Sequence, residues 1–77
     1  MIDPFKKMCA RVRGWLEEMG DALDGDALAL DSFTVVELIE RAERELGARV
    51  RSSDLTPERF ESVEAIAALF LESGGAP

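Results

Sequence analysis

The feature that most constrains this chain is the recurrence of apolar residues at helical spacing in three separate stretches. In residues 4–19, apolar side chains follow one another at intervals of three and four, which gathers them on one face of a helix. The same spacing returns in residues 32–46 and 62–72. No stretch shows the apolar–polar alternation of a half-buried strand. With 77 residues, the chain is long enough for one domain and one small core between helices.

Residues that favour helix ends stand at the borders of these stretches. They are Asp3 with Pro4, Gly20, Asp31, Gly47 and Ser62. Thr56 and Pro57 predict a further, shorter helix over residues 56–61. The fold class expected is therefore all-α, a small four-helix bundle of three main helices and one short helix. Residues 73–77 have the composition of a linker and predict a flexible tail.

The residue types that the chain lacks exclude several kinds of chemistry. It has no His and a single Cys, Cys9, so neither a His/Cys zinc site nor a disulfide can form within one chain. The lack of His also excludes a Ser-His or Cys-His nucleophile pair. The aspartates of residues 20–31 do not match the spacing of a calcium-binding loop. We therefore expect no catalytic site and no metal site.

The charge of the chain limits its partners. The formal net charge is −7, which argues against nucleic-acid binding because phosphate contacts need a basic surface. No apolar run approaches the roughly 20 residues that span a bilayer, so no membrane partner is expected. A single Cys and the lack of a signal peptide favour a cytoplasmic protein. Residues 20–40 hold six acidic side chains and no basic one, and this segment would attract a cationic partner.

Phe33 is unusual because helical spacing places this aromatic on the side of residues 32–46 that faces away from the core. Glu37 and Glu40 lie on the same side, and Val36 lies at its margin. An exposed aromatic beside acidic residues is typical of a docking surface for a basic partner. The alternative is that Phe33 folds back against the preceding loop or the next helix, and helical spacing alone does not decide between the two.

Ser32, by itself, is most simply read as part of a helix start. It stands beside an acidic loop, where another enzyme could modify its hydroxyl. The sequence Leu30-Asp31-Ser32-Phe33, followed by Val36-Glu37-Leu38, resembles the modification motif of the acyl carrier and peptidyl carrier protein family. Residues 43–47 and 56–66 are similar to later parts of the family pattern, and the resemblance covers roughly residues 5–72.

The resemblance implies that Ser32 carries 4′-phosphopantetheine, which a magnesium-dependent phosphopantetheinyl transferase takes from coenzyme A. It implies that Asp31 helps the transferase to recognise the site. Partners would include an acyl- or aminoacyl-loading ligase and downstream synthase or transferase enzymes. The residues expected to dock them are Phe33, Val36, Glu37 and Glu40. Because Met1 closely precedes the first helix, we expect a free-standing carrier, and we expect it to be a monomer.

The sequence departs from the family pattern at several positions. Ala29 replaces a usual Gly, Glu40 an often apolar residue, and Arg51 a frequent Pro, while Arg41 and Arg44 interrupt the acidic face. These differences favour specialised biosynthesis of the polyketide or nonribosomal peptide type. Two alternatives remain: an acyl carrier of fatty-acid synthesis, and a helical protein-interaction module that has the carrier fold but is never modified.

Overall fold

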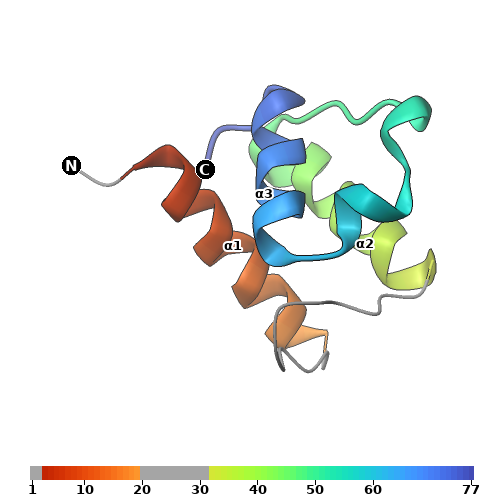
Figure 1. The fold of residues 1–77 in the computed structure, drawn as a ribbon. Helices are drawn as coiled ribbons and strands as arrows, with labels where there is room; N and C mark the ends of the chain where they lie inside the picture. The colour runs from red at the N-terminus through yellow and green to blue at the C-terminus, as the bar shows by residue number, and fades with distance from the viewer. Residues whose placement is uncertain (1–2, 20–31) are drawn as a thin grey trace.

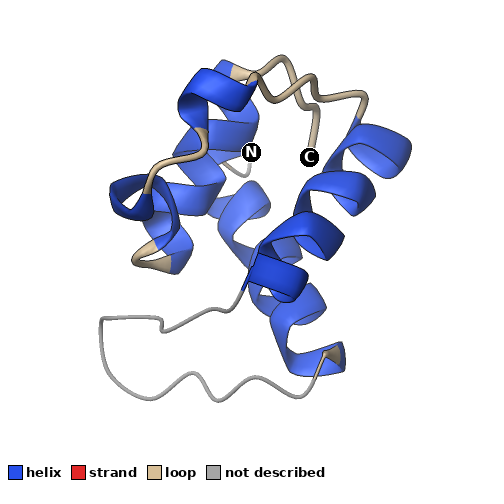
Figure 2. Ribbon diagram, turned by 90° about the vertical axis from the view of Figure 1, so that its right-hand side faces the viewer, coloured by secondary structure: helices blue, strands red, loops and turns tan. Residues whose placement is uncertain are grey.

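The computed structural model describes residues 3–19 and 32–77, and within these ranges it contains helices and no strand (Figure 2). The α-helices are α1 (Pro4–Glu18), α2 (Ser32–Leu46) and α3 (Val63–Glu72) (Figure 1). Two short 3-10 helices lie between α2 and α3: η1 (Ser52–Asp54) and η2 (Pro57–Phe60). The predicted all-α class and the three main helices are confirmed.

The helix ends follow the capping residues of the sequence. The Asp3 carboxylate accepts a hydrogen bond from the backbone N–H of Phe5 at 2.8 Å, and Ser62 Oγ accepts one from the N–H of Ala65 at 3.0 Å. Gly47 follows α2 with a φ of 72°, a left-handed conformation that glycine adopts without strain. These three predictions are confirmed. Gly20 and Asp31, predicted to end α1 and to cap α2, lie outside the described residues.

The short helix differs from its prediction. Residues 56–61 were expected to be helical, and the structure has only one 3-10 turn there, Pro57–Phe60, with no side-chain cap from Thr56. Ser62 adopts an extended conformation to cap α3, so an α-helix has no room to continue. Phe60 is buried and fixes this turn to the core. The helix η1 was not predicted.

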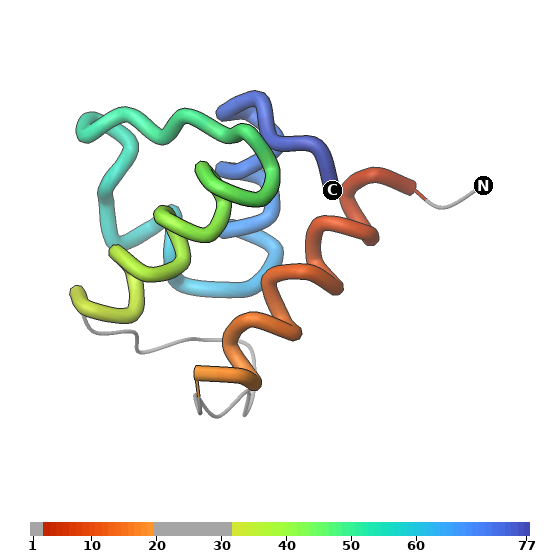
Figure 3. Tube along the Cα trace, turned by 180° about the vertical axis from the view of Figure 1, so that it is seen from behind, coloured from red at the N-terminus to blue at the C-terminus, as the bar shows by residue number. Residues whose placement is uncertain are grey.

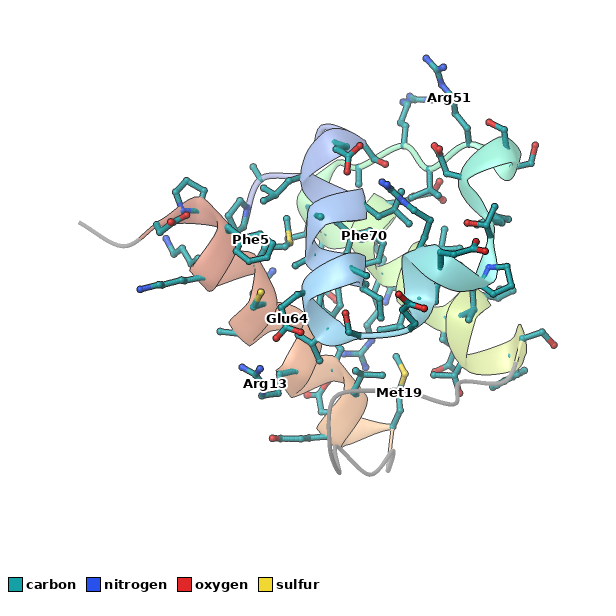
Figure 4. The ribbon with its side chains drawn as sticks, viewed as in Figure 1. Phe5, Arg13, Met19, Arg51, Glu64 and Phe70 are labelled. Carbon is teal, nitrogen blue, oxygen red and sulfur yellow. The ribbon has the colours of Figure 1, made fainter. Side chains whose placement is uncertain are left out.

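The core lies between α1 and α3 and is completed by one face of α2. Its fully buried large side chains are Met8, Val12, Leu16, Leu38, Ile66, Leu69 and Phe70. The rings of Trp15 and Phe70 meet at an angle of 56° with centroids 6.3 Å apart, which joins α1 to α3. Arg11 covers the outer side of Trp15, with its guanidinium carbon 5.6 Å from the ring centroid. Figure 4 places Phe70 in this interior.

The C-terminal residues are bound to the rest of the fold. The N–H of Gly75 donates to the carbonyl of Phe70 at 2.8 Å, and that of Ala76 to the carbonyl of Leu46 at 3.1 Å. The carbonyl of Ser73 accepts from the N–H of Arg49 at 2.9 Å. We call residues 73–76 the C-terminal clasp, because they join the end of α3 to the end of α2 (Figure 3). Composition predicted a flexible tail here, whereas its glycines serve a tight turn, with Gly74 at a φ of 87°.

The clasp predicts opposite effects for two Gly→Ala substitutions. A Cβ at Gly75 would lie 2.9 Å from the carbonyl oxygen of Phe70, so the clasp must shift, and we expect Gly75→Ala to cost about 1–2 kcal/mol of unfolding free energy. Gly14 lies inside α1 with nothing within 4 Å of its Cβ position, so Gly14→Ala should stabilise by about 0.5–1 kcal/mol. Urea unfolding followed by circular dichroism measures both. A neutral Gly75→Ala would show that the clasp contributes little to stability.

Candidate functional site

Ser32 is the first residue of α2 and its side chain is exposed. The backbone N–H groups at a helix start lack partners within the helix, and they favour a negative charge placed beside them. Within the helix itself, the first turn of α2 contains no acidic side chain. The hydroxyl of Ser32 is therefore placed where a phosphate ester would be accessible and electrostatically favoured. Asp31, the other residue predicted for this site, lies outside the described residues.

Phe33 is exposed, which decides between the two interpretations of this residue. It is 72% accessible, and Val36, one turn further along α2, is 52% accessible. The alternative in which Phe33 folds back against the next helix is therefore wrong, and the preceding loop, named in the same alternative, lies outside the described residues. The opposite side of the helix holds the buried residues Leu38, Ala42 and Leu46. Helix α2 thus has a core face and an apolar exposed face that begins beside Ser32.

Acidic side chains accompany these exposed apolar residues. Glu40 is exposed and Glu37 is half-buried, and neither forms an ion pair with another described residue. We call Phe33, Val36, Glu37 and Glu40 the Phe33 face. It combines apolar area with negative charge, which suits a partner with an apolar pocket bordered by basic groups.

The two arginines that interrupt the acidic character of α2 are both paired. Arg41 donates to the carboxylate of Glu18 in α1, and this hydrogen bond raises the pKa of Arg41. Arg44 lies 4.0 Å from the carboxylate of its neighbour Glu45. Both guanidinium groups thus have a carboxylate partner, and Arg41 also attracts the charge of Glu37, while Glu40 forms no ion pair with another described residue. The Arg41–Glu18 pair also ties the end of α1 to the middle of α2.

Cys9 does not form a second reactive site. The side chain is 8% accessible within the core, as its place in the apolar stripe predicted. Burial, assisted by the charge of Glu64, raises the pKa of the Cys9 thiol and disfavours the reactive thiolate. In the described residues no group of three His, Cys, Asp or Glu side chains is arranged to hold a metal ion. No helix in the same ranges is long and apolar enough to cross a membrane.

Leu55 is an exposed apolar residue for which the sequence analysis gave no role. It follows η1 and is 48% accessible. In the sequence it is a single leucine between Asp54 and Thr56, so no periodic pattern distinguishes an exposed position from a buried one. The sequence feature that points to an exposed Leu55 is its position between two polar residues, and this is weak evidence for exposure.

Comparison with known proteins gives one match. A scan against models of protein families matches residues 4–70 to the family described as "Phosphopantetheine attachment site". The matched segment includes α1, α2 and both 3-10 helices, and it extends to Phe70 within α3. A search of curated proteins and a search of solved structures each found no match.

Proposed function

Because the chain belongs to the phosphopantetheine attachment site family, we propose that Ser32 is the residue to which its 4′-phosphopantetheine arm is attached. The family attaches this group covalently to a serine, and a phosphopantetheine-carrier role follows for the chain. When bound, the arm supplies a thiol that holds an acyl or aminoacyl group as a thioester. Carrier domains of this family are generally not catalytic, and we infer the same of this chain.

The choice of Ser32 rests on a comparison of the serines within the matched segment. These serines are Ser32, Ser52, Ser53 and Ser62. The hydroxyl of Ser62 is engaged as the cap of α3. Ser52 and Ser53 belong to a 3-10 helix of three residues, which offers no extended helix start. Ser32 is exposed at the start of a helix of 15 residues, and this is the observation that carries the proposal.

In the attachment reaction, the carrier itself supplies the Ser32 hydroxyl that attacks phosphorus. A phosphodiester bond forms between Ser32 Oγ and the arm's phosphorus, while the P–O bond to the adenosine bisphosphate part of coenzyme A breaks. The proton of the Ser32 hydroxyl leaves to a base, and we assign that base to the phosphopantetheinyl transferase. The carrier's part is to present an accessible hydroxyl on a stable helix end. We propose, from the resemblance of its motif, that Asp31 assists recognition by the transferase.

The Phe33 face is the surface proposed to dock partner enzymes. A carrier must bind each partner briefly, so a small surface with an apolar centre and steering charge suits the task. Phe33 and Val36 supply the apolar part, and Glu37 and Glu40 supply the charge. The proposed partners are the transferase, an acyl- or aminoacyl-loading ligase and downstream synthase or transferase enzymes.

We propose that the pathway served by this carrier is specialised biosynthesis, of the polyketide or nonribosomal peptide type. Support comes from the departures of the sequence from the family pattern, above all Glu40, Arg41 and Arg44. Arg41 and Arg44 are engaged in ion pairs, so they change the acidic face without presenting two free positive charges. We further propose that the carrier is a cytoplasmic monomer.

Intact-protein mass tests the attachment. The purified chain is first shown to be free of the arm, and is then incubated with coenzyme A, magnesium and a broad-specificity phosphopantetheinyl transferase. We expect the mass to increase by one phosphopantetheine per chain. No increase would contradict the proposal and favour the unmodified interaction module instead.

Two substitutions test the docking surface. Phe33→Ala and Glu37→Arg should each slow transfer to a partner enzyme by about tenfold, because central interface residues contribute more than about 1 kcal/mol each. The unfolding free energy should change by less than about 0.5 kcal/mol for Phe33→Ala, since the ring is 72% accessible. Leu55→Ala is the matched control, an exposed apolar residue outside the Phe33 face. Equal slowing by Leu55→Ala would contradict the assignment of the surface.

A further inference from the structure

A second charged surface lies at the other end of α2, where the chain turns toward η1. A shallow depression is formed there by the loop after α2, η1, η2 and the end of α3. Its lining residues are Arg49, Val50, Arg51, Asp54, Arg59, Glu72 and Ser73. With three arginines against two carboxylates, the depression has a net positive charge in a chain whose net charge is −7.

Two of these arginines have no carboxylate partner among residues 3–19 and 32–77. Among the described residues, which include every arginine of the chain, five arginines form ion pairs: Arg11, Arg13, Arg41, Arg44 and Arg59. Arg49 and Arg51 form none, although acidic residues outnumber basic ones in the sequence by 16 to 9. Both side chains are exposed, and Arg51 extends into solvent at the edge of the molecule (Figure 4). Two unpaired guanidinium groups are thus left together on one surface.

The depression is also held in place by the surrounding fold. The backbone N–H of Arg49 donates to the carbonyl of Ser73 in the C-terminal clasp at 2.9 Å. Arg59 donates to the carboxylate of Glu72 at 2.9 Å, which fixes its guanidinium beside the end of α3. The Nε of Arg59 is enclosed and has no hydrogen-bond acceptor within the described structure. The backbone at Arg49 and the guanidinium of Arg59 are therefore held in place, while the exposed guanidinium groups of Arg49 and Arg51 remain available for a carboxylate.

We propose that this depression is a second docking site, which binds a carboxylate-bearing acidic segment of a partner protein through Arg49 and Arg51. The guanidinium group matches a carboxylate with two parallel hydrogen bonds. A doubly charged phosphate group fits less well, because Asp54 in the same depression repels two charges about twice as strongly as the single charge of a carboxylate. Nucleic acid does not suit a chain with this net charge.

The position of this site separates it from the attachment site. It adjoins the C-terminal end of α2, whereas Ser32 is at the N-terminal end (Figure 1). A helix of 15 residues is about 22 Å long, which exceeds the screening length of about 8 Å at physiological salt. The end of α2 that carries Ser32 is therefore electrostatically screened from the arginines, whereas Glu40 is nearer, about 9 Å along the helix axis from Leu46. A partner bound there would hold the carrier while Ser32 stays accessible.

The probe for this proposal is a blocked tri-glutamate peptide, titrated into the isotopically labelled protein and followed by NMR at constant low ionic strength. We expect shift changes at residues 49–51, 54, 59 and 73, and at the Nε–H signals of Arg49 and Arg51. The double variant Arg49→Gln/Arg51→Gln should bind about tenfold more weakly. The control Lys6→Gln/Lys7→Gln removes the same net charge from exposed positions of α1, and it should bind as the unchanged protein does.

Three results would overturn the proposal: equal weakening in both double variants, shift changes centred elsewhere, or equal or stronger perturbation by inorganic phosphate at the same ionic strength. The last result would indicate general anion binding instead of docking of an acidic segment. Mass gain with the transferase should be the same for Arg49→Gln/Arg51→Gln and the unchanged chain. Failure of this site and failure of attachment at Ser32 can therefore be told apart.

Discussion

Ser32→Ala is expected to abolish attachment of the phosphopantetheine arm completely. The substitution removes the oxygen that must form the phosphodiester bond, and no neighbouring side chain can supply it from the same place. In the assay with coenzyme A, magnesium and transferase, the unchanged chain should gain one arm and Ser32→Ala none. Its fold should be retained, because the Ser32 side chain is exposed and alanine is a favourable helix residue.

The matched control for this prediction is the double variant Ser52→Ala/Ser53→Ala. Both residues are exposed serines within the segment that matches the family, but they lie in η1 and not at the start of an α-helix. The double variant should gain the arm at the rate of the unchanged chain. Modification that persists in Ser32→Ala and disappears in the double variant would move the attachment site to η1. Circular dichroism of all three proteins would show whether any loss arises from unfolding.

Much of the fold could be predicted because helix faces and helix ends depend on residues that are close together in the sequence. Apolar spacing indicated which residues of α1, α2 and α3 face the core, and single capping residues such as Asp3 and Ser62 marked where helices begin. Helix α2 begins and ends at the predicted residues. Helical spacing also indicated that Phe33 faces away from Leu38. It could not decide whether another segment covers Phe33, because that depends on how the helices pack.

Other features could not be predicted because they depend on contacts between residues far apart in the sequence. The clasp exists because Gly75 and Ala76 meet carbonyl groups of α3 and α2, and composition alone suggested a linker. The arginine depression forms because the loop after α2, η2 and the end of α3 converge. Sequence reasoning noted Arg51 only as a departure from the family pattern. The attachment site itself was predicted by a motif, since an exposed serine at a helix start is not distinctive in physical terms.

Helix α2 must do two things at once: complete the core with one face and present the Phe33 face with the other. Leu38 and Val36 are two residues apart and lie on different sides of the helix, the first fully buried and the second 52% accessible. Substitution of either residue by alanine removes methyl groups from the same helix, and Val36→Ala in addition gains up to about 0.7 kcal/mol of helix propensity, which lowers its net cost further. Comparison of Leu38→Ala with Val36→Ala therefore separates the contribution of the core face to stability from that of the exposed face.

Leu38→Ala is expected to lower the unfolding free energy by roughly 2–5 kcal/mol, because it leaves a cavity in a core that has no solvent access at this residue. A chain of 77 residues has a total stability of about 4–12 kcal/mol, so this loss is a large part of it. Val36→Ala should cost less than about 1 kcal/mol. Urea unfolding followed by circular dichroism measures both, and equal losses would show that α2 does not pack as described. Since a stable helix end presents Ser32, Leu38→Ala should also slow arm attachment in proportion to its unfolded fraction, whereas Val36→Ala should leave the folded fraction unchanged.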